Sequence, residues 1–396
     1  MIDVGNFIDV GAIGAMLALA MAAFCYVATE TLPIGLLSLI SADLGVTTSS
    51  AGLLVTGYAL AVSVVTFPLT HLTRNVPRRR LIAVLLAILV LATLASAAAP
   101  GYGVLFGVRI AVALTQALFW AVVGPTVAAM FEVTVRGRVN AVVFAGASLG
   151  PMLGVPAGTW LGQQFGWRIA FVGLAVPALL AFLAIVTLMP DVAVHETHAA
   201  TGTTPSARRY AIVVTVTALS VAGLYTAFTY TEVFLTLVTG FALGAVGPLL
   251  LARGVADFVG IAAGGVATDR WQRASIAGAL IILAGSLLAG YSLASSRPAT
   301  AVLLAASGFA LGALTPALQN RVMEVAPGST DMASAGNSVA FNIGIAGGSL
   351  LGAGVLSGLG VRATTLVGGL LTLLALAVLA AEPLIAHRDT PARQAT

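Results

Sequence analysis

The sequence contains no lysine, because all 18 of its basic residues are arginines. An ATP-binding loop of the Walker type requires a lysine, so this absence argues against an ATP-driven pump. A lone cysteine, Cys25, excludes an intramolecular disulfide and a cysteine metal cluster. Charged residues make up only 8% of the 396 residues. So little polar surface excludes a soluble globular protein.

Hydrophobic residues make up 59% of the chain, and its mean hydropathy is +1.05. This composition predicts a polytopic membrane protein. The N-terminus carries only Asp3 and Asp9 before the first apolar run, without a basic region or a cleavage site. We therefore expect no removable signal peptide, and the first apolar run stays as a helix.

Twelve apolar segments are long enough to cross roughly 30 Å of hydrocarbon as helices. The first six lie near residues 13–40, 49–72, 80–99, 103–130, 138–162 and 168–189, and the second six near 210–237, 241–264, 275–295, 299–321, 332–357 and 362–385. The sequence predicts an all-α membrane protein of 12 transmembrane helices in two pseudo-symmetric six-helix bundles, 1–189 and 210–386. A linker at 190–209 and a tail at 387–396 complete this division.

Arginine placement predicts the orientation. If the N-terminus is cytoplasmic, thirteen arginines fall in the inside loops and tail and three in the outside loops. Because inside loops of membrane proteins collect arginine, we expect both termini in the cytoplasm of a bacterium and the chain in its inner membrane. The linker contains His195 and His198, three residues apart without a helical apolar pattern, so we interpret it as solvated chain and not as a metal site.

A glycine stretch marks the fifth predicted helix. Gly146, Gly150 and Gly154 recur every four residues, and Pro151 follows the second of them. Residues four apart share one helical face, so these glycines leave a groove in which another helix can lie at backbone contact. The spacing resembles the fifth-helix motif GxxxGPxxGG of drug/proton antiporters in the major facilitator superfamily, with Val155 in place of the last glycine. Ordinary packing of small residues between helices is the alternative.

A loop motif supports internal repetition. Between the eighth and ninth segments, Gly265, Asp269 and Arg270 resemble the superfamily's G-x-x-x-D-R-x-G-R loop, with Gln272 replacing its glycine. The matching loop of the first half keeps an arginine cluster but has Arg74 where the family has aspartate. The resemblance implies that the glycine face and this loop serve conformational change, and repeated halves are how such transporters build two bundles around a central site.

Ionisable residues inside apolar segments are costly and usually functional. Glu30 lies in the first segment, Arg109 in the fourth and Glu232 in the seventh. Arg109 resembles the proton-coupling R-x-x-x-G motif, with Ala113 for the glycine. Counted from the outside ends, Glu30 and Arg109 lie at similar depths, so we expect Glu30 to carry a coupling proton and Arg109 to tune it. A permanent ion pair, or Glu232 as the carrier, are the alternatives.

Candidate substrate contacts combine aromatic, amide and charged side chains. They are Tyr58, Phe119, Trp120, Tyr225, Phe228, Tyr230, Phe341, Asn337, Asn342, Arg253 and Asp257. Aromatic rings can stack on a sugar or a planar drug, although helix packing is their commoner use. A buried amide needs hydrogen-bond partners, which a ligand can supply. Arg253 and Asp257, four apart on one helix, serve either substrate or a local ion pair.

Several stretches narrow the resemblance, among them Thr29 to Leu37, Tyr225 to Phe234 and Phe341 to Gly352. Together they look like the bacterial sugar-efflux (arabinose exporter) and chloramphenicol-resistance branch. This implies proton-coupled efflux of a small solute, such as a sugar or an amphenicol-like drug, by alternating access. A uniporter or importer of a metabolite such as a nucleoside is the alternative. We expect no enzyme activity, no cofactor, no metal and no nucleic-acid partner, and a monomer working with a small-molecule substrate, protons and the lipid bilayer.

Overall fold

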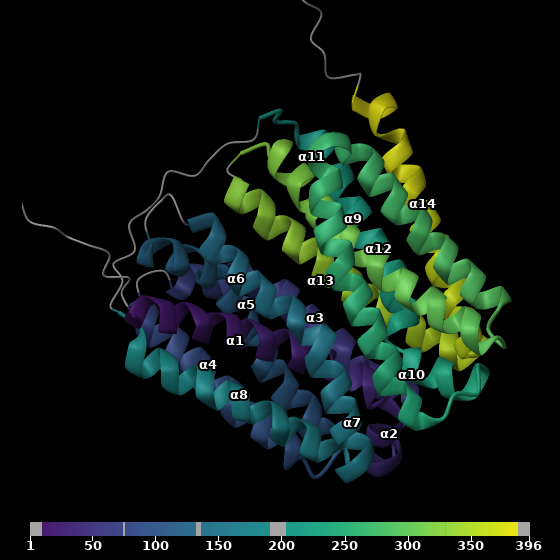
Figure 1. The fold of residues 1–396 in the computed structure, drawn as a ribbon, viewed down its shortest axis with the longest axis horizontal. Helices are drawn as coiled ribbons and strands as arrows, with labels where there is room; N and C mark the ends of the chain where they lie inside the picture. Colours follow the sequence, from purple (N-terminus) through teal and green to yellow (C-terminus); the bar gives the residue numbers. More distant parts are fainter. Residues whose placement is uncertain (1–9, 74–75, 132–135, 191–202, 329, 387–396) are drawn as a thin grey trace, which may run out of the picture. The chain divides into compact units, whose positions relative to one another are not determined.

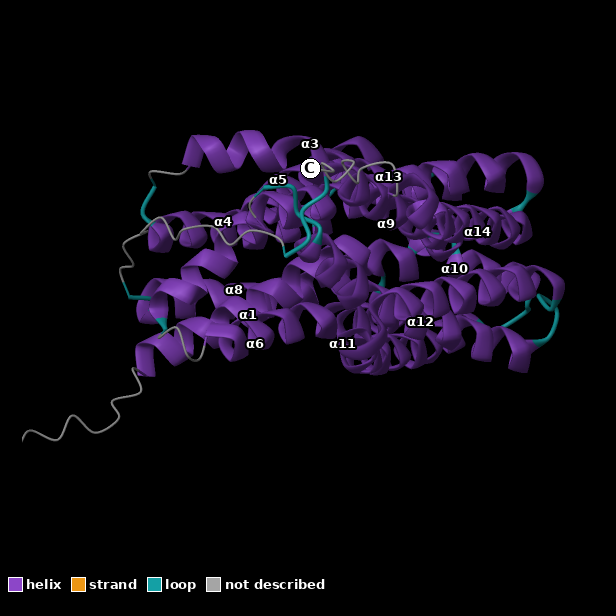
Figure 2. Cartoon of the chain, turned by 90° about the horizontal axis from the view of Figure 1, so that it is seen from above, coloured by secondary structure: helices purple, strands orange, loops and turns teal. Residues whose placement is uncertain are grey.

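The computed structural model describes residues 10–73, 76–131, 136–190, 203–328 and 330–386. Within these ranges the chain is helical, with loops between the helices and no strand (Figures 1 and 2). Twelve helical segments of this part are long and apolar enough to cross a membrane. The predicted all-α fold with 12 transmembrane helices is confirmed.

The chain divides into two compact units. The first comprises Met1–Thr197, Thr231–Thr236 and Phe241–Gly254, and the second comprises His198–Tyr230, Leu237–Gly240 and Val255–Thr396. Two short pieces of the second half of the sequence therefore pack with the first half. The division expected from the sequence, into 1–189 and 210–386 with a linker at 190–209, stays a prediction.

The first half of the chain forms the helices α1 (Val10–Thr31), η1 (Leu32–Gly35), α2 (Leu37–Leu44), α3 (Thr48–Thr73), α4 (Arg78–Ala97), α5 (Tyr102–Met130), α6 (Arg136–Leu149), η2 (Gly150–Gly154), α7 (Val155–Phe165) and α8 (Trp167–Leu188). The second half forms α9 (Ala207–Phe228), α10 (Thr231–Val233), η3 (Phe234–Val238), η4 (Leu243–Ala245), α11 (Val246–Ser292), α12 (Arg297–Glu324), α13 (Thr330–Leu359) and α14 (Val361–Ala386).

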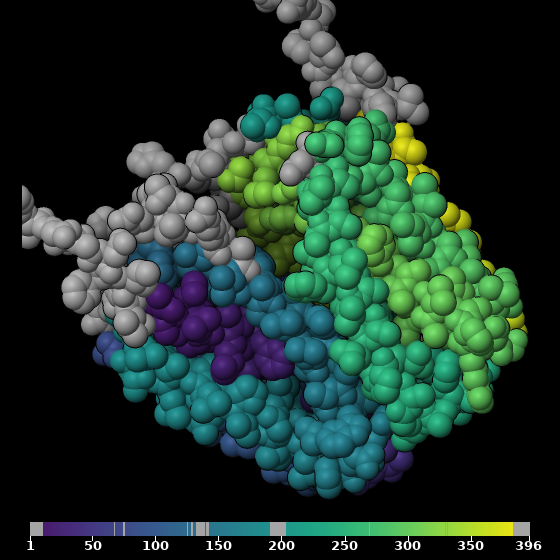
Figure 3. All heavy atoms as spheres, in the orientation of Figure 1, coloured from purple at the N-terminus to yellow at the C-terminus, as the bar shows by residue number. Residues whose placement is uncertain are grey.

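Helix α1 is the centre of the first unit, where it packs against α3, α4, α5, α6 and α8. Its atoms reach the surface between neighbouring helices (Figure 3), and its Leu17 side chain is exposed. The opposite face, with Tyr26 and Cys25, is fully buried in the core. This burial pattern places any ionisable residue on the inner face of α1 out of contact with lipid.

Two helices differ from the continuous segments that the sequence predicts. The proline-containing fifth segment contains a π-helical turn, η2, between α6 and α7. The seventh segment ends as an α-helix at Phe228 and continues through the short α10 and the π-helical η3. The eighth and ninth segments are two separate spans, Leu243–Thr268 and Arg270–Ser292, and α11 is kinked between them at Trp271, whose φ of −140° and ψ of 56° are not helical.

The glycine stripe of α6 and η2 packs against the backbone of α1. A Cβ placed on Gly146 would overlap the carbonyl of Ala20, and one on Gly150 would crowd Phe24 and Ala28. The second unit repeats this contact, because Gly344, Gly348 and Gly352 of α13 approach the carbonyl oxygens of Ala218, Ala222 and Thr226 in α9. Glycine is required here because no other residue permits such a close approach of two helix backbones.

We expect Gly146→Ala to lower the thermal melting temperature of the purified protein. The added methyl group forces α6 away from α1, and overpacking of this kind costs about 1–3 kcal/mol. The matched control is Gly107→Ala in α5, where a Cβ meets nothing within 4 Å. That variant should melt at the wild-type temperature or above it, and equal melting of the two variants would contradict the contact.

Candidate functional site

The α1 helix ends where the sequence removes a backbone donor. In a continuing helix the carbonyl of Thr29 would accept from the amide of residue 33, but Pro33 has no N–H. The chain leaves the α-helix after Thr31 and continues as the 3₁₀ turn η1. The last carbonyls of a helix lack partners inside it, so this buried end needs donors from elsewhere.

Arg109 of α5 supplies these donors. Its Nη1 donates to the carbonyl of Thr29 at 3.0 Å, and its Nη2 donates to the carbonyl of Glu30, also at 3.0 Å. The side chain is 1% exposed, and its guanidinium lies 5.1 Å from the centre of the Tyr58 ring. The planar fork of arginine matches two adjacent acceptors, so Arg109 ties α5 to the broken end of α1.

The Glu30 carboxyl has a different partner. Its Oε2 accepts a hydrogen bond of 2.7 Å from Nε2 of Gln116, while its buried Oε1 has no hydrogen-bond partner. No ion pair joins Glu30 to Arg109 among the residues that the structure describes. The arginine is thus bound to the backbone of Glu30, and the carboxyl keeps one oxygen without a partner.

Gln116 and Tyr58 extend this cluster to α3. The Tyr58 hydroxyl donates to Oε1 of Gln116 at 2.6 Å, and neither side chain is more than 3% exposed. The sequence predicts Tyr58 as a substrate contact and gives no role to Gln116. The available signal was spacing, since Gln116 follows Arg109 by seven residues, two helical turns, and so lies on the same face of α5.

Glu232 also lies in the first unit. Its carboxylate oxygens accept from the hydroxyl of Ser38 at 2.6 and 2.7 Å, and Oε2 accepts from the amide of Ser38 at 3.0 Å. Ser38 is the second residue of α2, so the acid caps the start of that helix, where free amide groups favour a negative charge. Glu232 is therefore already held by three hydrogen bonds, unlike Glu30.

The aromatic candidates of the first unit pack against other rings. Phe119 is fully buried, 4.8 Å from the ring of Tyr26 and 5.5 Å from that of Trp120. Trp120 is partly exposed and stacks on Phe144 at 5.8 Å. Of this pair, only Trp120 is placed to meet a ligand, because Phe119 belongs to the core.

Three of the four aromatic candidates of the second unit lie at the end of α9 or directly after it in the sequence. Tyr225 and Phe228 pack edge to face at 5.7 Å. The Tyr230 hydroxyl donates to the carbonyl of Ser349 at 3.1 Å, and Tyr230 is fully buried. Phe341 of α13 is partly buried. The structure thus places Tyr230 in a packing role between α9 and α13.

The two asparagines of α13 differ in their environment. Asn337 is buried, accepting from Thr217 at 2.8 Å and donating to Gln319 at 3.0 Å. Asn342 donates to the carbonyl of Ser338, and its buried Oδ1 has no hydrogen-bond partner. Asn342 therefore keeps an acceptor for a ligand, whereas Asn337 belongs to an internal network that the sequence did not indicate.

The remaining candidates lie on α11. Arg253 is buried and Asp257 partly buried, one helical turn apart. Gly265 has open space around its Cα, and Arg270 is exposed. The side chain of Asp269 and the residues Arg74, His195 and His198 lie outside the described part. Within that part, no cluster of three histidine, cysteine, aspartate or glutamate residues could hold a metal ion.

Comparison with known proteins identifies the family. Residues 19–327 match the sequence profile of the Major Facilitator Superfamily. The chain is also 33% identical over 389 residues to YtbD of Bacillus subtilis (strain 168), an uncharacterized MFS-type transporter, with 95% of this chain and 97% of that protein covered. The chain belongs to the major facilitator superfamily.

Solved structures of the superfamily share this fold. A bacterial homologue of the human lysosomal transporter Spinster, in an inward-facing and unoccupied conformation, matches with a TM-score of 0.74 at 15% identity, covering 98% of this chain and 100% of that one. A D-xylose–proton symporter matches with a TM-score of 0.71 at 14% identity, covering 93% and 96%. These likenesses show the fold, and the antiporter branch stays a prediction. Proteins of the major facilitator superfamily transport small solutes across membranes, and we assign that general role to this chain.

In this major facilitator protein, we expect Arg109→Lys to lower the melting temperature by several degrees. A lysine ammonium is a point donor and cannot serve both carbonyls with the geometry of the guanidinium fork, and an orphaned buried acceptor costs about 1–3 kcal/mol. Arg297→Lys is the control, because Arg297 is exposed and donates to the carbonyl of Gly240 at the protein surface. Equal melting of the two variants would show that the carbonyls do not depend on Arg109.

Proposed function

We propose that this protein is a proton-coupled antiporter that exports a small solute by alternating access, and that Glu30 carries the coupling proton. The observation that supports this most is the free Oε1 of the buried Glu30 carboxyl. A carboxyl held by one hydrogen bond and no ion pair loses fewer interactions when it takes up a proton than a carboxyl that is ion-paired or fully hydrogen-bonded.

The surroundings of Glu30 support a change of protonation state. Its single hydrogen bond from Gln116 stabilises the charged form, while burial favours the neutral form. Arg109 contributes positive charge nearby but is fixed on the backbone carbonyls. Small movements of α1 or α5 therefore change the balance, which is what coupling to a transport cycle requires.

We propose export as the direction of transport because the fifth-helix motif resembles that of drug/proton antiporters. The glycine stripe that carries this resemblance lies against α1 at the level of Ala20 to Ala28, directly before Glu30. Movement of the glycine stripe along this face of α1 would therefore act on the part of α1 next to Glu30. We propose that the glycine face is conformational and that the ligand is a sugar-sized or amphenicol-sized solute.

The main test is transport by Glu30→Gln in proteoliposomes, with the solute that a growth screen of amphenicols, sugars and nucleosides identifies. The variant should lose accumulation driven by a pH gradient, because it has no exchangeable proton, and it should keep counterflow of labelled solute. Wild-type protein should alkalinise the vesicle lumen when substrate is added.

Glu232→Gln is the matched control for this test. It makes the same chemical change at another buried acid, one held by Ser38. If Glu30→Gln still concentrates solute and Glu232→Gln does not, the coupling proton belongs to Glu232. Absence of lumen alkalinisation in the wild type would instead support a uniporter.

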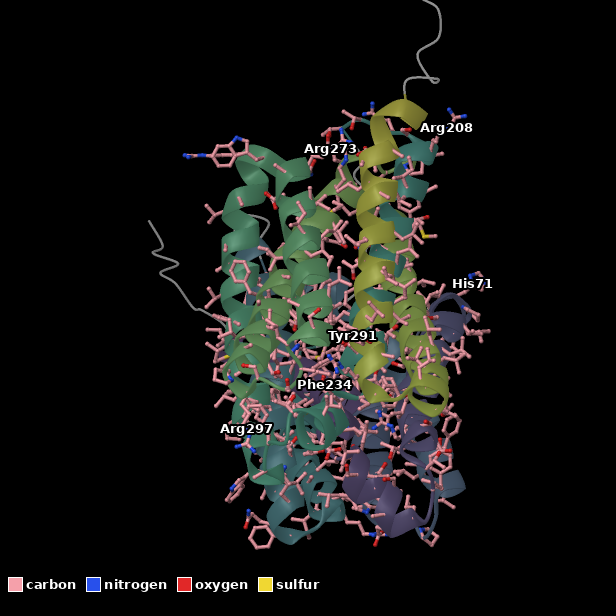
Figure 4. The ribbon with its side chains drawn as sticks, turned by 90° about the vertical axis from the view of Figure 1, so that its right-hand side faces the viewer. His71, Arg208, Phe234, Arg273, Tyr291 and Arg297 are labelled. Atoms are coloured by element: carbon pink, nitrogen blue, oxygen red, sulfur yellow. The ribbon has the colours of Figure 1, made fainter. Side chains whose placement is uncertain are left out.

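We also propose that both termini lie in the cytoplasm. In the second unit, Arg208 and Arg273 lie at one end of the helices and Arg297 towards the other (Figure 4). A cysteine at the exposed Thr203, beside Arg208, should react with an impermeant thiol reagent only after the inner membrane is opened. Ser295→Cys, near Arg297, should react in intact spheroplasts, and native Cys25 is buried. The reverse pattern would invert the topology.

A further inference from the structure

The chain of hydrogen bonds from Tyr58 through Gln116 to Glu30 has a defined direction. A carboxylate can only accept hydrogen bonds, so an ionised Glu30 requires the amide NH₂ of Gln116 to face it. The carbonyl oxygen of Gln116 then faces Tyr58, whose hydroxyl donates to it at 2.6 Å. Each bond in the series selects the orientation of the next.

From this geometry we infer that Gln116, oriented by the Tyr58 hydroxyl, is a positioning residue that holds Glu30 in its ionised form and sets the pH at which it accepts a proton. The inference rests on the proposed function only in taking Glu30 as the coupling acid. Neither Tyr58 nor Gln116 need touch the substrate for this role.

Protonation of Glu30 conflicts with this series of hydrogen bonds. A proton from water placed on Oε1 would create a buried O–H donor on an oxygen that has no hydrogen-bond partner among the described residues. If Gln116 instead turned its amide to accept this proton, its NH₂ would face Tyr58. The Tyr58 hydroxyl would then have to accept, and would lose the acceptor for its own proton. Either arrangement leaves one buried donor without a partner, which is unfavourable.

Other groups near Glu30 do not replace this control. Arg109 of α5 donates to backbone carbonyls, Tyr26 of α1 donates to the carbonyl of Leu85 at 3.3 Å, and Tyr102 lies at the start of α5. The other charged residues of helices packed on α1 stand at or near helix ends, namely His71, Arg78, Arg79, Arg80, Arg136, Arg138 and Arg168. The turns η1 and η2 have no titratable residue.

The experiment follows the protonated carboxyl of Glu30 directly. Infrared difference spectra of the full-length protein in liposomes record the C=O stretch of protonated acids as the pH is changed. The part of this band that Glu30→Gln removes belongs to Glu30, and its midpoint gives the pH of protonation. No substrate is needed, so the measurement is independent of transport.

Tyr58→Phe should move this midpoint upward by about one pH unit, a tenfold gain in proton affinity. Without the hydroxyl, the Gln116 amide is free to turn and accept from protonated Glu30. Gln116→Met, which removes the donor while keeping an unbranched side chain, should also move the midpoint upward. The matched control is Tyr26→Phe, the same change at an equally buried tyrosine, which should leave the midpoint in place.

The double variant Tyr58→Phe with Gln116→Met tests the order of the chain. If Tyr58 acts through Gln116, the double variant should have the midpoint of Gln116→Met alone. Additive shifts, unchanged midpoints or downward shifts in the single variants would each overturn the inference. A Glu30→Gln protein that still couples transport to protons would instead refute the proposed function, whatever the infrared midpoints show.

Discussion

The two hydrogen bonds from Arg109 to the carbonyls of Thr29 and Glu30 are the interaction on which the functional site depends. Pro33 ends α1 inside the protein, and a buried helix end without donors is unfavourable. Arg109 resolves this conflict and fixes α5 against α1. The break in turn places the following turn η1 where a straight helix would not. Arg109, to which the family resemblance gives a role in proton coupling, thus binds backbone carbonyls in this structure.

Each half of the chain contains the same kind of close contact between a glycine of one helix and the backbone of another. Gly146 meets Ala20 and Gly344 meets Ala218, and each pair is separated by 126 residues along the chain (146 minus 20, 344 minus 218). Only the first half interrupts the stripe with Pro151 and a π-helical turn, while α13 continues without a break. The halves therefore share a packing scheme and differ in where a helix can bend. This difference agrees with coupling chemistry placed beside α1.

The sequence indicates the charged residues of the site but not its neutral polar residues. Glu30, Arg109 and Glu232 stand out in apolar segments because a charge there is costly. Gln116, Ser38, Gln319 and Thr217 do not stand out, since neutral polar residues are common in transmembrane helices. Their importance appears only from the partners they meet on other helices. Tyr58 is a similar case. Its aromatic ring predicted a contact with the ligand, whereas in the structure its hydroxyl donates a hydrogen bond to Gln116.

Composition and periodicity alone determined that this is a 12-helix membrane protein, because the bilayer requires long apolar helices whatever their partners. The glycine spacing likewise determined which face of the fifth helix packs closely. Tertiary structure decided which oxygens and nitrogens meet: that Arg109 binds carbonyls and not the Glu30 carboxyl, and that Glu232 caps α2. Hydrogen bonds between distant segments depend on sub-ångström placement by packing, and no local pattern in the sequence encodes that placement.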